Sequence, residues 1–537
     1  MNTMTSSSGF SSRLYAILIL QPLGLDRQTS PLLLLLVIFG VTLAGSLWIF
    51  AGEVPVTAAI IYLLMLVLIT FSRPDISLYM LLFLTLLLDQ LQLTGFQPVT
   101  YYAEFFRNIK EISYLPEIGA AGFNPAELHI SLLVFAWFIH FSLNPKITFA
   151  SIPVWPAYLL FFGWFIFSIV YGLYKGGDFL VALWEVRAMF YMSILYLLVP
   201  QLIRTKKQIQ IMMWVILAAV TIKAFQGLYR YASLGFSTSG FEALTNSEDT
   251  VFMVMLFVLL LAFLVFKVNH KQKIWLLIFL LPLALGFYAG QRRASFAALI
   301  VTFLVFVSLL PSQMQWSFLK RAFPVLAALL LYGFLFWNST SPYAGPVQLV
   351  KSGIVTPDRY ENMRDYHSNL YRDIENYNLS TTVKNNTILG VGFGNKYDMP
   401  VELVQIQFPL RDYIPHNQIL WIYVKMGLVG FILFWYFFLS FSYKGVTIFV
   451  KLRDPYLKAI AAFVILAVIN QIIVAFFDVM MTFYSNMIFL GCVMGLLPAL
   501  EKLADDEQKK RKLNKVDANF KTKKKSNQLS RKQWFNG

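Results

Sequence analysis

Runs of about twenty consecutive apolar residues are the feature that most constrains what this chain can form. A helix rises about 1.5 Å per residue, so a helix of about twenty residues crosses the hydrocarbon layer of a bilayer. Only 13% of the 537 residues are charged and 58% are hydrophobic, whereas about a quarter of the residues of a soluble domain are charged. The sequence therefore predicts an all-α fold, a polytopic transmembrane helical bundle of about 12–14 spans with one long loop.

The apolar runs predict about fourteen helices, two of which are less regular than the others. The segment 179–200 is interrupted by Glu185 and Arg187, and the segment 76–92 is short. The predicted helices are 31–51, 54–71, 76–92, 126–143, 154–174, 179–200, 207–228, 250–268, 274–290, 294–311, 321–338, 416–441, 457–477 and 480–499.

Lysine and arginine residues in the short loops predict the orientation of the bundle. They favour the cytoplasmic side, and alternate loops carry them, among them Arg73, Lys146 and Lys320. Both termini are then cytoplasmic. The predicted organisation is a cytoplasmic N-terminal segment (1–30), a transmembrane bundle (31–338), a large extracytoplasmic loop (339–415), C-terminal transmembrane helices (416–500) and a basic, disordered cytoplasmic tail (501–537).

The net charge of +16 does not indicate a nucleic-acid partner, because no folded basic surface accompanies the basic tail. The lipid bilayer, and its anionic lipids in particular, is the expected partner of that tail. The single cysteine, Cys492, lies in an apolar run. It excludes an intrachain disulfide framework and a cysteine-ligated zinc site.

Three arginines lie where membrane proteins seldom place them. Arg292 and Arg293 follow Gln291 in a tight turn on the predicted outer side, against the positive-inside bias. They either reach the lipid headgroups of the outer leaflet or bind an anion. Guanidinium groups bind phosphate oxygens, and the N-terminus of the helix that follows also favours an anion. Arg187 lies inside a span, at a cost of about 3 kcal/mol. It is either half of a structural ion pair or a ligand for the same anion, and we favour the anion.

His416 follows the long loop and opens a helix in residues 414–418 (IPHNQ). It is either structural or a general base acting on a sugar hydroxyl, because histidine exchanges protons near neutral pH. Asn417 beside it is expected to orient the ring or to bind sugar. The preceding loop supplies further polar groups, including Arg364 and Arg372.

Several motifs, taken in order, resemble the O-antigen ligase and O-antigen polymerase superfamily. Residues 386–395 (NTILGVGFGN) resemble its glycine-rich turn, and residues 415–420 (PHNQIL) resemble its HNxxL motif. Residues 425–430 (KMGLVG) resemble its ExGxxG motif, and residues 291–295 (QRRAS) resemble its SRxA turn. Arg187 falls where the family has an arginine in an earlier span.

The sequence also departs from the family pattern. Lys425 stands where the family usually has glutamate, Ile388 replaces a proline, and a second arginine follows Arg292. The motifs cover roughly residues 180–435. The departures leave the choice between ligase and polymerase open, but not the general class.

The resemblance implies an inverting, metal-independent glycosyltransferase in the bacterial inner membrane, with its active site facing the periplasm or exterior and no cofactor. The donor would be a glycan on undecaprenyl diphosphate, and the acceptor a glycan or a lipid core. The resemblance implies three catalytic residues. Arg187 and Arg292 would hold the diphosphate, and His416 would accept the proton of the acceptor hydroxyl. The implied substrate-binding residues are Gln291, Arg293, Arg364, Arg372, Gly392, Gly394 and Asn417.

The extra spans and the large loop favour a polysaccharide polymerase, whose further partners would be chain-length regulator and flippase proteins. A ligase that transfers glycan to lipid A-core or another acceptor is the alternative within the class. A polysaccharide or small-solute transporter is the alternative of another class. It would need ionisable groups near the membrane midplane, for which the candidates are scattered along the chain: Asp89, Lys223, Asn470 and Asp478.

Overall fold

The chain forms an all-α bundle, as the sequence predicts. The predicted N-terminal segment 1–30, the predicted span 31–51 and the end of the tail from residue 512 lie outside the described residues. Within the described part there are helices and no strand. The computed structural model describes residues 54–90, 99–111, 122–145, 148–236, 243–339, 341–356, 360, 362–404 and 408–511.

Nine helices of the described part are long and apolar enough to cross a membrane. The predicted span 274–290 is broken into α11 (Lys271–Ile278) and α12 (Leu280–Ala289), which meet at a bend of 55°. Three shorter apolar stretches are Tyr62–Ser72 within α3 (Val54–Ser72), α4 (Pro74–Leu87) and α13 (Arg293–Leu309). The nine are α6 (Pro125–Leu143), α7 (Trp155–Tyr174), α8 (Phe179–Leu202), α9 (Lys206–Ser233), α10 (Ser247–Val265), α14 (Ser312–Phe336), α17 (Gln418–Lys451), α18 (Pro455–Ala475) and the helix that opens with α19 (Tyr484–Met494).

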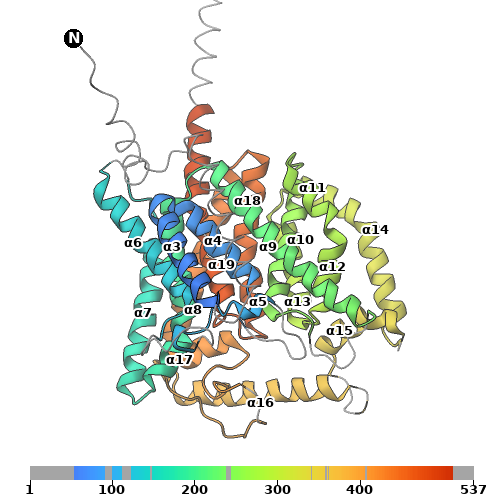
Figure 1. The fold of residues 1–537 in the computed structure, drawn as a ribbon. Coiled ribbons are helices and arrows are strands. Elements are labelled where there is room, and N and C mark those ends of the chain that lie inside the picture. The colour runs from blue at the N-terminus through green and yellow to red at the C-terminus, as the bar shows by residue number, and fades with distance from the viewer. Residues whose placement is uncertain are drawn as a thin grey trace, which may run out of the picture.

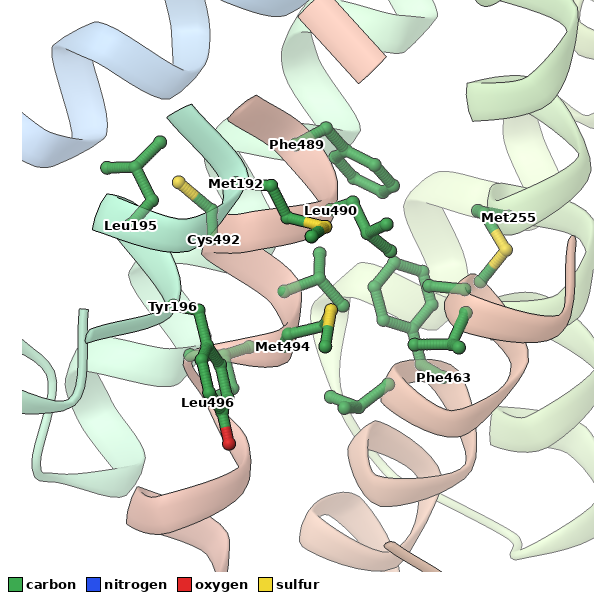
Figure 2. Close-up of a cluster of buried hydrophobic side chains, with 14 of the residues drawn as sticks. Met192, Leu195, Tyr196, Met255, Phe463, Phe489, Leu490, Cys492, Met494 and Leu496 are labelled. Carbon is green, nitrogen blue, oxygen red and sulfur yellow. The ribbon is translucent and has the colours of Figure 1, made fainter. Parts of the chain in front are cut away.

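The core lies where α8, α10, α18 and α19 meet (Figure 2). Met192 of α8, Met255 of α10 and Phe463 of α18 surround side chains of α19. Gly491 of α19 has no side chain, and a Cβ there would lie 2.6 Å from the carbonyl oxygen of Met192. Small residues of this kind let helix backbones pack closely in a membrane, where van der Waals contact drives association.

The first residues of the tail that the sequence predicts to be disordered are helical in the structure. The helix that starts at Tyr484 runs on to Arg511, so residues 501–511 are helical. Glu501 pairs with Lys444 at 2.5 Å, and Glu507 accepts a hydrogen bond from the backbone N–H of Arg453 at 3.1 Å. These contacts with the end of α17 supply the partners that the sequence of the tail alone does not reveal.

Two of the scattered transporter candidates lie together inside the bundle. Lys223 of α9 pairs with Asp89, and Asp249 of α10 lies 3.7 Å from the same ammonium group. Asn246 donates a hydrogen bond to Asp89 at 2.7 Å. These four side chains are buried and line none of the cavities of the site described below. Mutual pairing is how buried charges are usually accommodated in a membrane protein.

The described residues of the segment 339–415 include two α-helices, which lie at one end of the bundle. These helices are α15 (Gly345–Ile354) and α16 (Met363–Asn385), and α16 runs crosswise to the spans (Figure 1). The buried residues of α16 are Glu375, Asn378, Leu379 and Thr382. Their spacing forms one stripe of a helix, so the stripe turns a carboxylate toward the bundle.

Candidate functional site

A buried carboxylate holds the histidine that the sequence singled out. His416 precedes α17, and Glu375 lies on the buried stripe of α16. One oxygen of Glu375 accepts the backbone N–H of His416 at 2.9 Å, and the other lies 3.2 Å from Nδ1 of the imidazole. The side chain of Glu375 is 2% exposed and that of His416 27%. An ionised carboxylate can only accept, so this contact places the proton of a neutral imidazole on Nδ1 and leaves Nε2 as an acceptor.

Arg372 of α16 joins three cavities at this end of the bundle. The largest, which we call the arginine cavity, has a volume of about 1240 Å³ and is also lined by Arg292, Arg293 and Arg364. The second, the tyrosine cavity, measures about 490 Å³ and is lined by Tyr371 and His416. A third of about 240 Å³, the histidine cavity, is lined by Glu375, His416 and Asn417.

The arginine cavity combines positive charge with an apolar wall. Arg292, Arg364 and Arg372 line it together with Gln291, and Asp365, Asp373 and Asp478 line it too. Phe296, Ala297 and Ile300 extend the lining along the apolar helix α13. An anionic headgroup with an attached hydrocarbon chain therefore finds complementary groups in one cavity.

The turn before α13 aims its residues in different directions. Gln291 has the left-handed φ of 51°, and Arg292 is the residue that precedes the first turn of α13. Arg293 donates hydrogen bonds to the carbonyl oxygen of Ser352 and to Oδ1 of Asn369, both at 2.9 Å. Arg293 thus lines the cavity while its guanidinium ties α15 and α16 to α13.

Both polar atoms of the Asn417 side-chain amide form hydrogen bonds within the protein. Its side-chain oxygen accepts the N–H of Leu420 at 3.1 Å and so caps α17, and its amide nitrogen donates to Asn376 of α16 at 3.0 Å. The cap fixes where α17 begins, and so where His416 stands.

Residues 277–435 match a protein-family model whose description is O-antigen ligase. This match supports the resemblance of residues 277–435, called the ligase domain below, to the O-antigen ligase and polymerase superfamily. The match runs from α11 into α17 and contains every residue so far described at the three cavities except Asp478. A search among curated proteins found no match. The matched family indicates membrane glycan processing of O-antigen ligase or polymerase type, and the nine apolar helices of the described part fit a multi-pass membrane protein.

Arg187 lies outside this ligase domain, and the structure does not bring it to the arginine cavity. Its Nε is 3.1 Å from a carboxylate oxygen of Glu127, and its other nitrogens donate to Asn108 at 3.0 Å and to the carbonyl oxygen of Gly122 at 2.8 Å. The ring of Trp184 lies 5.4 Å from the guanidinium. The prediction that Arg187 joins Arg292 and His416 around one cavity is therefore wrong, because protein groups already occupy this guanidinium.

The glycine-rich turn of the ligase domain also differs from its prediction. Gly392 and Gly394 line none of the three cavities and pack against α7 and α8 instead. The N–H of Gly394 donates to Glu185 at 2.6 Å, and Glu185 lies 2.6 Å from Lys425, both side chains being fully buried. The turn is a packing device, and Lys425 has in Glu185 the partner that its departure from the family pattern requires.

Gly392→Ala is expected to destabilise the protein. Gly392 has φ of 77°, and a Cβ at this position would lie 2.3 Å from Cα of Gly172, which is backbone and cannot move aside. Strain and overlap together should cost about 2 kcal/mol or more. Thermal unfolding of the detergent-solubilised protein measures the loss. Gly176→Ala also has a positive φ but no neighbour within 4 Å, so it should be much milder; equal losses would contradict the packing role.

The sequence alone gives no direct sign of the role of Glu375. A carboxylate at one position of an otherwise polar loop attracts no notice, and its partner lies 41 residues away. The signal that could have found it is the stripe 375, 378, 379 and 382, because a carboxylate on the buried face of an amphipathic helix needs a partner.

Proposed function

We propose that the protein is a polysaccharide polymerase that transfers a glycan from undecaprenyl diphosphate to a sugar hydroxyl, at the outer face of the bacterial inner membrane. The observation that carries the proposal is the arrangement around Arg372. A cavity rich in guanidinium groups and a carboxylate-held imidazole meet at this one side chain. Leaving-group binding and proton removal are the two requirements of this transfer.

The donor is assigned to the arginine cavity. Arg292, Arg364 and Arg372 would hold the diphosphate, and the apolar wall of α13 would carry the first part of the lipid. Negative charge grows on the diphosphate as the sugar–oxygen bond breaks, and fixed guanidinium groups stabilise that charge without reorganisation. The arginines would take the place of a divalent cation, which makes the proposed transfer metal-independent.

His416 is assigned the role of general base. The acceptor hydroxyl oxygen attacks the anomeric carbon, the bond from that carbon to the diphosphate oxygen breaks, and undecaprenyl diphosphate leaves. The hydroxyl proton passes to Nε2 of His416, while Glu375 holds Nδ1–H and stabilises the imidazolium that forms. Attack from the side opposite the leaving group inverts the anomeric centre.

A ligase is the second candidate, favoured by the description of the matched family as O-antigen ligase. The chemistry at His416 and the arginines is the same in both cases, and only the acceptor differs. Loss of a polymerase leaves single repeat units on the lipid carrier. Loss of a ligase leaves long chains on that carrier, so the lipid-linked products of inactive variants distinguish the two.

Arg292→Ala is expected to reduce kcat/KM for the lipid-linked donor by about 10²–10³-fold, and Arg292→Lys should recover only part of it, because lysine lacks the bidentate geometry of arginine. Cells that carry each variant at matched expression should accumulate lipid-linked glycan, measured in organic extracts. Arg453→Ala is the control, since Arg453 is exposed beyond the far end of α17. Normal surface glycan and normal intermediates in the Arg292→Ala cells would rule out the assigned phosphate site.

A further inference from the structure

The tyrosine cavity lies against a different face of α16 from the arginine cavity. Apart from Arg364 in its first turn and two shared residues, α16 lines the arginine cavity with residues 365, 369, 373 and 376. It lines the tyrosine cavity with residues 367, 370, 371 and 374. Successive residues of a helix are about 100° apart, so the two sets point to two sides of the helix. Ser368 and Arg372 line both cavities and stand at the boundary.

Two side chains at the tyrosine cavity have a hydrogen-bond donor group without an acceptor among the described residues. The hydroxyl of Tyr371 and Nε of Arg372 are shielded from solvent, and neither has a hydrogen-bond partner among the described residues. Burial and the nearby Glu375 carboxylate raise the pKa of Tyr371 to about 12, so the hydroxyl keeps its proton at neutral pH. A buried hydrogen-bond donor without an acceptor is costly. Both side chains line the cavity, so a rotation of either one would bring its donor group to the oxygen atoms of a saccharide there.

Hydrogen bonds within the protein hold the backbone of the chain that forms one side of the tyrosine cavity. Arg411 donates to the carbonyl oxygens of Leu403 and Val404, at 3.3 and 2.9 Å. Asn378 of α16 exchanges two hydrogen bonds with the backbone of Val401. The described residues that line the cavity belong to α16 or are Leu403, Val404, Phe408 and His416. No residue of a transmembrane helix is among them.

We propose that the tyrosine cavity is the binding site for the acceptor saccharide, whose reacting hydroxyl meets the lipid-linked donor beside Arg372, a side chain that lines both cavities. This inference rests on the proposed glycosyl transfer and assigns its second substrate. Aromatic and aliphatic side chains from Tyr371, Phe408 and Leu370 offer surface for the apolar face of a sugar ring. The ring of Tyr371 meets that of His416 edge to face, with centroids 5.5 Å apart, so a sugar bound there presents its hydroxyl beside the base.

The test uses the whole protein in liposomes with two substrates varied independently. The donor probe is the lipid-linked glycan extracted from cells that lack this protein, and the acceptor probe is the same glycan released from its lipid by mild acid. Tyr371→Phe keeps the ring and removes only the hydroxyl. It should raise the KM for the acceptor about five- to tenfold, the value of one hydrogen bond, and leave the KM for the donor unchanged.

Two further variants make the result specific. Leu370→Trp fills the cavity and should abolish saturation by the acceptor, while donor affinity persists. Tyr377→Phe is the matched control, because Tyr377 lies on α16, is 58% exposed and lines none of the three cavities; both KM values should stay at the wild-type level. A rise in the donor KM instead, or wild-type values in both Tyr371→Phe and Leu370→Trp, would overturn the acceptor assignment. A wild-type protein that transfers no glycan contradicts the proposed function itself, and the acceptor assignment falls with it.

Discussion

His416→Ala is expected to lower the turnover number of glycan transfer by about 10²–10⁴-fold, the usual contribution of a general base. The KM for the lipid-linked donor should hardly change, because His416 does not line the arginine cavity that is proposed to bind the donor by its charge. Initial rates with extracted lipid-linked glycan measure both quantities. A variant that retains more than about a tenth of the wild-type turnover would be incompatible with the general-base role.

Glu375 supplies the control for this prediction. If it acts only by holding the imidazole, then the double variant His416→Ala/Glu375→Ala should be no slower than His416→Ala alone, since groups that act as one unit lose their effect together. Glu375→Gln keeps the shape, but its amide can present a donor to Nδ1 and favour the other tautomer, so it should also be slow. Multiplied losses in the double variant would show that Glu375 has a separate structural role.

Lys425→Met is expected to produce the largest loss of stability. Lys425 and Glu185 are both 0% exposed and 2.6 Å apart, so removal of the lysine leaves a buried carboxylate without its counter-charge. Breaking such a pair costs about 3–5 kcal/mol. The midpoint of thermal unfolding in detergent should fall accordingly, and less protein should reach the membrane.

The double variant Glu185→Gln/Lys425→Met should recover much of this loss, because the amide oxygen can still accept the N–H of Gly394 while no charge remains. Lys444→Met is the matched control. Lys444 pairs with Glu501 at 2.5 Å, but the two side chains are 33% and 21% exposed, and pairs open to solvent contribute less than about 1 kcal/mol. Equal destabilisation by Lys425→Met and Lys444→Met would contradict the buried-pair argument.

The positions of the transmembrane helices follow from the sequence because length and hydropathy are local properties. The predicted spans 126–143 and 457–477 correspond to α6 and α18 to within two residues. The turn at 291–293 and the start of α17 near His416 were also predictable, since polar residues interrupt apolar runs there. The motifs in these places supported the family resemblance that the match to residues 277–435 confirms.

Only the tertiary structure decided which polar groups meet. Arg187 pairs with Glu127, Glu185 with Lys425, and Glu375 with His416, and none of these pairs is close in sequence. The physical reason is that a transmembrane helix is apolar on the face toward lipid and on the face toward the core alike, because lipid and core are both apolar solvents. The hydrophobic pattern of such a helix therefore determines that the helix spans the membrane. Packing against the neighbouring helices sets the rotation of the helix about its axis, and so determines the partner of each buried charge.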